Sequence, residues 1–531
     1  MNRLLPLIAA ALLLAALPTA ASASRTQEST FQDDIQLVYG TPEVVDSTLD
    51  QLRALGVDRI RVSVFWKLVA PANESAQKPN FDPTDPAAYP AANWGRYDRL
   101  ITSAKQRGIL VNLNITSPLP RWAAGTAPAD RQDLQETWAP STAEFGQFVK
   151  AVGTRYSGSY EGLPRVDYWS IWNEPNQAGW LTPQWTPDPA NSGNQVEAAP
   201  AIYRGLVAAA WTALAESGHG SDTILVGETA PQGLRNNKGV SRSIDALRFI
   251  RGLYCVDDNL QLLKGRSADA RSCPRGDPAA FVAQNPALFR ASGYAHHPYD
   301  LLSPPDRKPK PDDWVTIANL NDLSRELRRI YQRYGQKPQT KRGTPLYLTE
   351  YGYQTKPDPF APSFSQQAAW INEAEYRAMR DPNVRTLSQF LLVDDAPVPG
   401  IDTQTNPREA WRTFQSGLLS LTGKRKPSYK AYITPLFVKT PRVRRGTQAR
   451  IFGMLRTADT SVPEKVSIQF RKKGSKRYKT RKRLTVLGPR HYLNTGVSVP
   501  SDGYLRLRWK DGSKAVVSRS VRVTVLRKRS K

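Results

Sequence analysis

The sequence has few residues of the kinds that bind metals. Its 531 residues include only two cysteines, Cys255 and Cys273, and four histidines. Neither cysteine lies near a histidine pair with the spacing of zinc ligands, which argues against a zinc site. We therefore expect a protein that uses no metal and no cofactor.

Long apolar runs are also missing, except at the N-terminus. After the charge of Arg3, an apolar run covers residues 4–17, and Ala21-Ser22-Ala23 then forms the small-x-small pattern of a signal-peptide cleavage site. A membrane anchor is the alternative, although this run is short for crossing a bilayer. The sequence predicts a signal peptide over residues 1–23, no later transmembrane segment, and a secreted or cell-wall-associated protein.

This predicted location bears on the two cysteines. In an oxidising compartment a local pair is most simply a disulfide, which would close one loop and contribute about 3 kcal/mol to stability. Two separate buried thiols are the alternative. We expect Cys255 and Cys273 to be bonded to each other.

Acidic residues are scarce in the last part of the chain. Residues 437–531 contain 27 lysines and arginines against 4 acidic residues, whereas the rest of the chain is nearly neutral. A dense run of basic residues covers 471–483; such a run is either a solvated face or a binding site for an anionic cell-wall polymer or acidic polysaccharide. No nucleic-acid motif is present, so nucleic acid is not the expected partner.

The nearly neutral part of the chain alternates predicted strands with predicted helices. Because parallel strands need helical crossovers, eight such units predict a (β/α)8 TIM barrel over residues 24–436, an α/β fold with its active site at the carboxyl ends of the strands. The predicted strands are 35–38, 60–65, 109–115, 166–172, 224–226, 294–297, 346–349 and 384–393.

The basic segment, residues 437–531, shows a different pattern. Short alternating strands are predicted over 449–455, 465–470, 482–487, 504–509 and 516–525, with a two-residue hairpin turn at Asp511-Gly512. Helical periodicity is absent. A small all-β sandwich of immunoglobulin-like kind is the best interpretation for a domain of this size.

Two glutamates end predicted strands of the barrel. Glu174 follows an aromatic run on strand four and precedes Pro175, and Glu350 ends strand seven. Two carboxyl groups at one cleft are what glycosidic-bond cleavage requires, because one protonates the leaving oxygen while the other attacks the anomeric carbon or activates water. A third glutamate, Glu228 on strand five, is interpreted as a buried residue that fixes a loop.

The strand ends as a set resemble clan A of the glycoside hydrolases. The motifs that carry the resemblance are Trp172-Asn173-Glu174-Pro175, Leu348-Thr349-Glu350-Tyr351, the spacing of Arg61 and Trp66, and His297-Pro298-Tyr299. The wider context of the first motif is similar to the branch that contains β-xylosidases, α-L-iduronidases and exopolysaccharide hydrolases. The resemblance covers roughly residues 30–430.

The resemblance implies a retaining glycosidase that acts on an oligo- or polysaccharide. Glu350 is then the nucleophile, supported by Arg61 and Tyr299, and Glu174 is the acid/base catalyst. Asn173 is implied to bind the sugar hydroxyl next to the anomeric carbon. The alternative function is a catalytically silent protein that binds cell-surface glycans through the same cleft.

Other residues are predicted to bind the substrate. Of two neighbouring histidines, only one can face the cleft, and His297 is favoured over His296. Trp66, Trp122 and Trp180 are candidates for stacking on sugar rings. The resemblance also implies a tryptophan at the end of strand eight, but the sequence has none there, so Phe390, Asp394 or Asp395 is expected to meet the sugar.

Overall fold

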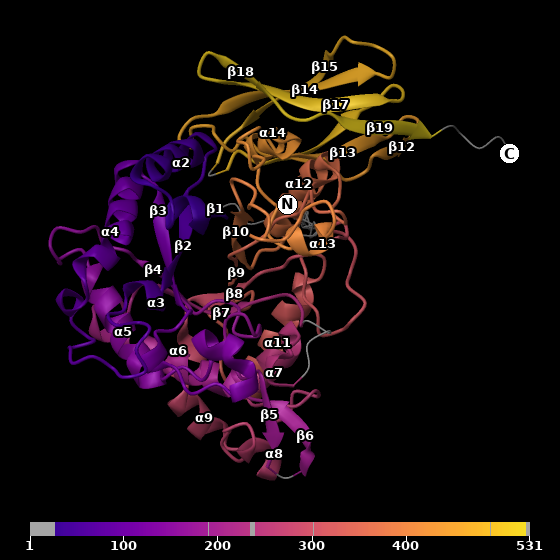
Figure 1. Cartoon of the computed structure of the whole chain (residues 1–531). Coiled ribbons are helices and arrows are strands. Elements are labelled where there is room, and N and C mark those ends of the chain that lie inside the picture. Colours follow the sequence, from indigo (N-terminus) through magenta and orange to yellow (C-terminus); the bar gives the residue numbers. More distant parts are fainter. Residues whose placement is uncertain (1–26, 190, 234–238, 301, 489, 527–531) are drawn as a thin grey trace, which may run out of the picture.

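A computed structural model describes residues 27–526 except 190, 234–238, 301 and 489. Eight parallel strands form a closed barrel in the order β1-β10-β9-β8-β7-β4-β3-β2 (Figure 1). The fold is therefore the predicted (β/α)8 barrel followed by a smaller antiparallel domain. The barrel strands are β1 (Glu28–Gln32), β2 (Arg59–Phe65), β3 (Leu110–Thr116), β4 (Tyr168–Ile171), β7 (Thr223–Thr229), β8 (Gly293–His296), β9 (Leu346–Leu348) and β10 (Val384–Phe390).

Helices surround the barrel and cover its apolar outer face. In α2, for example, the Thr41 side chain caps the first turn, Pro42 occupies its start, and Val45, Leu49 and Leu52 are buried. No helix of the described residues is long and apolar enough to cross a membrane. The main covering helices are α2 (Pro42–Ala54), α4 (Ala91–Gln106), α5 (Thr142–Arg155), α6 (Ala199–Glu216), α7 (Ala246–Leu253), α11 (Leu320–Arg333) and α12 (Phe364–Arg380).

Shorter elements occupy the connections. They include a hairpin of β5 (Trp185–Asp188) and β6 (Asn191–Glu197), which lies beyond β4 on the catalytic side. The short helices are α1 (Asp34–Leu37), α3 (Trp66–Val69), α8 (Gly265–Asp269), α9 (Pro278–Gln284), α10 (Pro286–Arg290), α13 (Pro407–Ala410) and α14 (Pro427–Ile433), and 3-10 turns cover Pro86–Ala88, Arg121–Ala123, Ala129–Thr137 and Gly239–Ser241.

The first strand of the barrel lies earlier than predicted. The segment predicted as a strand, 35–38, forms helix α1 together with Asp34, because the Asp33 carboxylate accepts a hydrogen bond from the Gln36 amide and caps the turn. Strand β1 is the preceding segment, which pairs in parallel with β10 and β2. Its sequence is polar and short, so its period-2 pattern gives little signal.

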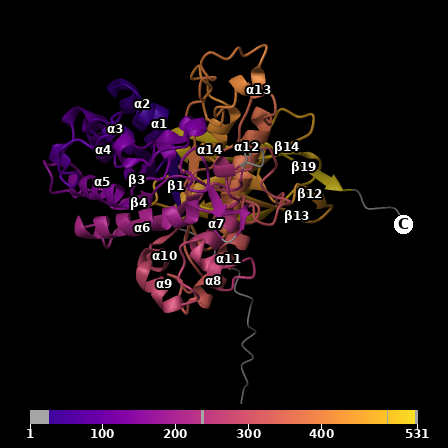
Figure 2. The same ribbon diagram turned by 60° about the horizontal axis from the view of Figure 1, so that its bottom comes forward.

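The insertion between α7 and β8 contains the predicted disulfide. Cys255 and Cys273 are bonded, with a Cα–Cα distance of 5.8 Å. The bond ties the end of α7 to the segment after α8, and this insertion lies far from the C-terminal domain (Figures 1 and 2). The disulfide prediction is confirmed.

The C-terminal domain is a β-sandwich, as predicted. One sheet contains β11 (Leu436–Val438), β13 (Gln448–Gly453) and β16 (Leu493–Ser498); the other contains β12 (Arg442–Arg444), β14 (Glu464–Lys472), β15 (Lys479–Val486), β17 (Gly503–Asp511), β18 (Lys514–Val517) and β19 (Val521–Leu526). The predicted hairpin at Asp511-Gly512 joins β17 and β18. Its immunoglobulin-like kinship stays a prediction.

Three details of this domain differ from the sequence prediction. The last predicted strand is two strands, β18 and β19, because Ser518 leaves the ladder and its hydroxyl bonds the Leu507 amide instead. Strands β11, β12 and β16 were not predicted, since they are short or contain glycine. Strand β11 pairs with β13, so the chain enters the sandwich at Leu436.

Buried contacts join the two domains. Arg456 forms an ion pair with Glu375 at 2.7 Å, and both side chains are almost fully buried. The Asn372 side chain bonds the Leu436 amide and the Arg519 guanidinium. The two domains therefore pack against each other through buried polar contacts.

Candidate active site

Glu174 and Glu350 meet at the carboxyl end of the barrel. Glu174 lies three residues after the end of β4, and Glu350 lies two residues after β9. One carboxylate oxygen of each, together with a ring nitrogen of His297, lie within 4.8 Å of one another. The barrel thus brings together two carboxyl groups that are 176 residues apart in sequence.

The turn that carries Glu174 is held in an unusual conformation. Trp172 and Glu174 have positive φ angles of 67° and 36°, which non-glycine residues rarely adopt. The Glu174 amide donates to the Glu228 carbonyl oxygen at 2.9 Å, and the Asn173 amide donates to the Thr116 hydroxyl at 3.1 Å. Neighbouring strands therefore fix this turn and aim the Glu174 carboxyl into the cleft.

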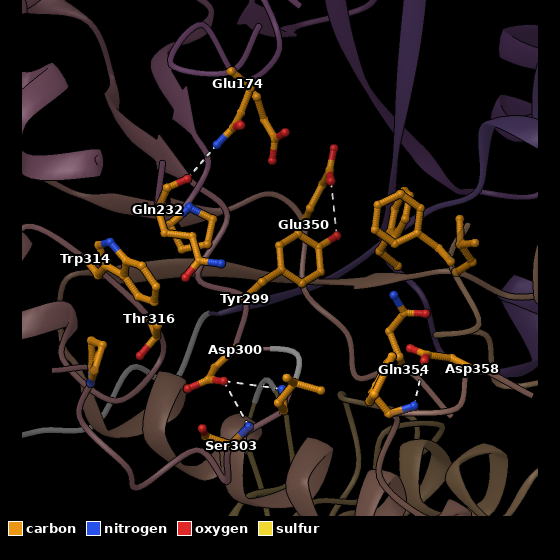
Figure 3. Close-up of a pocket in the computed structure, with 18 of the residues that line it drawn as sticks. Glu174, Gln232, Tyr299, Asp300, Ser303, Trp314, Thr316, Glu350, Gln354 and Asp358 are labelled. Atoms are coloured by element: carbon orange, nitrogen blue, oxygen red, sulfur yellow. Dashed lines mark hydrogen bonds between the residues drawn. The ribbon is translucent and has the colours of Figure 1, made fainter. Parts of the chain in front are cut away.

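Glu350 is held by two side chains. Arg61 on β2 donates to its Oε1 at 2.8 Å, and the Tyr299 hydroxyl donates to its Oε2 at 3.1 Å (Figure 3). Burial raises the pKa of Glu350, and the positive charges of His297 and Arg61 oppose this effect. Glu350 is 7 % exposed, which leaves one edge of the carboxyl group open to the cleft.

Arg61 bonds four polar side chains at the floor of the site. Besides Glu350, its guanidinium donates to Asn173 Oδ1 at 2.7 Å, to Glu228 Oε2 at 2.9 Å and to Gln32 Oε1 at 2.5 Å. The side chain is fully buried and does not line the cleft. Arg61 therefore orients Asn173 and Glu350 instead of touching the substrate, and the Asn173 amide nitrogen is left to face the cleft.

His297 is fully buried and does not line the cleft, so the prediction that it binds the substrate is wrong; it connects Glu174 to Glu228 instead. Its Nδ1 lies 2.8 Å from Glu174 Oε1 and its Nε2 lies 2.9 Å from Glu228 Oε2. Although burial lowers its pKa, the charge of Glu350 and the bonds to Glu174 and Glu228 raise the pKa of His297 to about 9. His297 is therefore a cation at neutral pH, whereas His296 bonds Thr229 and burial lowers the pKa of His296 to about 3.

Glu228 is the residue whose role the sequence did not give. It is fully buried, and its Oε2 accepts hydrogen bonds from Arg61, His297 and the Thr349 hydroxyl. Burial raises its pKa, but Arg61 and His297 outweigh this and lower the pKa of Glu228 to about 2. Rather than fixing a loop, the Glu228 side chain is the counter-ion that keeps Arg61 and His297 in place beneath Glu174 and Glu350.

The spacing of Glu174, His297 and Glu350 would suit a metal ion, but their hydrogen bonds do not. Both ring nitrogens of His297 are bonded to carboxylates, so neither has a free lone pair for a metal. The cation between the carboxylates is therefore His297 itself. This donor set does not fit a resident metal.

A cleft of about 1250 Å³ opens above the two carboxyl groups (Figure 3). Asn173, Glu174, Tyr299 and Glu350 line its centre. Trp180 lines this cleft and also an adjoining polar cavity of about 1020 Å³. The residues farther out include Asp34, Gln177, Gln232, Arg307, Lys310, Trp314, Gln354, Asp358, Phe390, Asp395, Arg408 and Phe414.

Two of the predicted stacking residues do not line the cleft. Trp66 is fully buried, and its ring stacks on Phe148 with the centroids 5.4 Å apart, so the prediction that it binds substrate is wrong. Trp122 packs edge-on against Trp66, and its indole nitrogen donates to the Pro71 carbonyl. Trp66 belongs to the core and Trp122 is partly buried against it, so of the three predicted tryptophans only Trp180 lines the cleft.

The end of strand eight, β10, is built from phenyl rings. Phe390 lines the cleft and meets Phe414 edge-to-face, with the ring centroids 5.1 Å apart. Asp395 also lines the cleft, and burial raises its pKa to about 6. Asp394 is turned away and forms a buried ion pair with Lys426 at 2.6 Å, so it is not available to a sugar.

A barrel with two carboxyl groups at its strand ends and a long cleft above them defines a glycoside hydrolase. The family model described as "Cellulase (glycosyl hydrolase family 5)" matches residues 21–383. The chain therefore belongs to the cellulase family, glycosyl hydrolase family 5. A comparison with curated proteins finds no match.

Several solved structures are similar to this chain at low sequence identity. They include a GH5_18 protein from Streptomyces cattleya in complex with GlcNAc (16 % identity, TM-score 0.45, covering 77 % of this chain and 79 % of that one). The endo-β-1,4-mannanase from Thermotoga petrophila has 13 % identity and a TM-score of 0.40, covering 95 % and 98 %. The β-glycosidase from Thermosphaera aggregans has 15 % identity and a TM-score of 0.43, covering 78 % and 95 %.

Proposed function

We propose that this protein is a secreted, retaining glycoside hydrolase that cleaves an oligo- or polysaccharide by double displacement. The observation that carries the proposal is the closeness of Glu174 and Glu350, whose carboxylate oxygens approach within 4.8 Å. Retaining enzymes hold their carboxyl groups about 5–5.5 Å apart, whereas inverting enzymes need about 6.5–9.5 Å to admit a water molecule. The separation favours direct attack by one carboxylate.

In this mechanism Glu350 is the nucleophile. Arg61 and Tyr299 hold its two oxygens, so one face of the carboxylate is presented to the anomeric carbon. As the new bond from Glu350 to that carbon forms, the bond to the leaving oxygen breaks, and Glu174 donates a proton to this oxygen. A water molecule then attacks the glycosyl–enzyme, Glu174 takes the proton from it, and Glu350 is released as a carboxylate.

The neighbouring residues support specific parts of these steps. The Asn173 amide faces the cleft beside the nucleophile, where it can donate to the sugar hydroxyl next to the anomeric carbon. His297 donates to Glu174 Oε1 and thereby holds the acid/base carboxyl group in one orientation through both steps. Trp180, between two adjoining cavities, offers a flat ring for a sugar unit beyond the bond that is cleaved.

The substrate proposal rests on the size and openness of the cleft. A space of about 1250 Å³ that adjoins a second one holds several sugar units, so a glycan chain fits better than a disaccharide. The export proposal rests on the signal-like residues 1–23 and is consistent with the disulfide. The similarity to β-xylosidases, α-L-iduronidases and exopolysaccharide hydrolases supplies candidate test substrates.

The decisive test is covalent trapping. Mechanism-based 2-deoxy-2-fluoroglycosides of glucose, mannose and xylose should label the protein, and peptide mapping should place the label on Glu350. Glu174→Gln should accept the label from an activated donor but should slow hydrolysis of unactivated glycosides far more than that of aryl glycosides. A label on another residue would refute the assignment, and the absence of both label and turnover would favour the glycan-binding alternative.

A further inference from the structure

The outer face of the larger sheet of the C-terminal domain carries a continuous band of basic side chains. Side chains alternate along each strand, and Val443, Val466, Leu505, Leu507 and Val523 point inward to the core of the sandwich. The residues between them point outward. They are Arg442 and Arg444 on β12, Arg522 on β19, Arg506, Arg508 and Lys510 on β17, Lys465 and Arg471 on β14, and Arg481 and Arg483 on β15.

The strand register turns these residues into rows that cross the sheet. Arg508 on β17 lies opposite Ser467 on β14, which in turn lies opposite Arg483 on β15. Arg471 lies opposite Tyr504, which lies opposite Arg522. In Figure 1, β14, β15 and β17 form the top of the domain, and eight of these ten basic side chains are exposed, so most of the basic face is accessible to large molecules.

The positive charges of the basic face are not balanced within the protein. In the described part of the chain none of these ten side chains forms an ion pair; the ion pairs of this domain are those of Arg456 and Arg490 with barrel residues. Alternation places no acidic residue at the outward positions of these strands. Partial burial, together with the charges of Arg508 and Arg471, lowers the pKa of Arg506, which shows how closely the cations are packed.

Two tyrosine rings stack on the guanidinium groups of Arg471 and Arg506. The guanidinium of Arg506 lies 3.8 Å from the centroid of the Tyr478 ring, and that of Arg471 lies 4.4 Å from the centroid of the Tyr504 ring. The Tyr478 hydroxyl is fixed by the Ser520 hydroxyl at 2.7 Å. A guanidinium stacked in this way keeps N–H donors free at its edge, which is the geometry for bidentate bonding to a carboxylate.

Each guanidinium also has one anchoring bond. Arg506 Nε donates to Gln469 Oε1 at 2.9 Å, and Arg471 Nη1 donates to the Ser475 carbonyl at 2.6 Å. In the part of the chain that the structure describes, no carboxylate accepts a hydrogen bond from the remaining N–H groups of either guanidinium. The pair is therefore pre-organised, so that binding an anion costs little side-chain entropy.

We propose that this basic face binds a carboxylated polysaccharide, so that the barrel is held on an acidic glycan surface. The rows of arginines match a chain with a negative charge on successive sugars, and the tyrosine rings beside them offer faces on which sugars pack. A carbohydrate partner is favoured over nucleic acid because the same chain carries a barrel of a carbohydrate-cleaving family. The proposal does not depend on the catalytic mechanism.

The test is affinity electrophoresis and interferometry of the full chain with sodium polygalacturonate as the probe. Arg471→Gln/Arg506→Gln should weaken binding at least tenfold, while the matched control Arg99→Gln/Lys105→Gln, which removes the same charge from exposed positions on α4, should change it less than twofold. Arg471→Lys/Arg506→Lys keeps the charge and should still weaken binding at least threefold. Neutral dextran should not bind, and added salt should weaken the complex.

Several outcomes would overturn the proposal. Equal losses in the α4 control would show an effect of net charge, and unchanged binding by the double lysine variant would rule out the stacked guanidinium groups as the recognition element. Tighter binding of oligo(dT) or polyphosphate than of polygalacturonate at equal ionic strength would assign the face to a different polymer. The double lysine variant keeps the test decisive if the glutamine variant does not fold.

Discussion

Removing the charge of Glu228 should affect the protein differently from removing the charge of Glu350. Glu228 is fully buried, and its Oε2 accepts from Arg61 at 2.9 Å, from His297 at 2.9 Å and from Thr349 at 2.7 Å. Breaking a buried ion pair by neutralising one partner costs about 3–5 kcal/mol. Because Arg61 keeps Glu350 as a second partner, we expect Glu228→Gln to lower the free energy of unfolding by about 3 kcal/mol, near the lower end of this range.

The protein lowers the pKa of Glu228, whereas it raises the pKa of Glu350. Burial and the nearby carboxylates Glu174 and Glu228 raise its pKa, so the folded protein disfavours its charged form. Glu350→Gln should therefore leave the free energy of unfolding unchanged or increase it. Turnover, by contrast, should fall by about 10⁴-fold or more, because the variant lacks its nucleophile.

Both effects are measurable in the same preparations. Urea unfolding followed by tryptophan fluorescence reports on the barrel, which holds most of the tryptophans. Turnover is measured on an aryl glycoside that the wild-type protein cleaves, and Asp50→Asn on α2 serves as a control for loss of an exposed carboxylate remote from the cleft. A Glu228→Gln protein as stable as the wild type, or a Glu350→Gln protein destabilised by about 3 kcal/mol, would refute the assignment of counter-ion and nucleophile.

Three further predictions test other parts of the structure. Because the pKa of His297 is raised to about 9, the folded protein keeps this histidine charged at neutral pH. The stability that the charge contributes is complete below the ordinary histidine pKa and is lost as pH rises through about 9, so kcat/KM and stability should both fall over this range. A flat profile to pH 10 would contradict this. Trp180→Ala should raise KM with little change in stability. Trp66→Ala should instead lower the free energy of unfolding in urea by about 3–5 kcal/mol. A change in KM alone for Trp66→Ala would show that Trp66 does contact the substrate. Replacing Cys255 and Cys273 with serine should cost about 3 kcal/mol, and stability equal to that of the wild type would show that the bond is dispensable.

The closeness of Glu174 and Glu350 was predictable because the barrel topology determines where their strands end. Parallel strands in a closed barrel all end at one rim, so Glu174 and Glu350 had to approach once their strands were recognised. The support of Glu350 by Arg61 and Tyr299 was instead implied by the resemblance to clan A, and both side chains do bond Glu350. Glu228 was recognised as buried, but its partners were not, since sequence does not show which buried charges face one another.

The failures have equally physical causes. Arg61 lies on β2, but Trp66 follows the end of that strand as the first residue of α3, and its ring packs against Phe148, which the motif spacing alone does not show. Strand β1 is polar and only five residues long, and the apolar residues after it signalled a strand where Asp33 caps a helical turn. At residues 35–38 the helix cap therefore outweighs the apolar pattern, and at β1 the pattern is too weak to predict the strand.

Strand eight remains the part of the site that distinguishes this chain. Phe390 and Phe414 meet edge-to-face at the position where a single indole is implied by the resemblance, and Phe390 also meets Tyr299, the hydroxyl donor to Glu350. Two phenyl rings thus replace the apolar surface of one indole but offer no indole N–H donor. Asp395 lies farther along the cleft, and its pKa of about 6 lets it donate or accept a hydrogen bond near neutral pH. A neutral sugar hydroxyl can make either bond, so no cationic sugar is needed to account for this acidic residue.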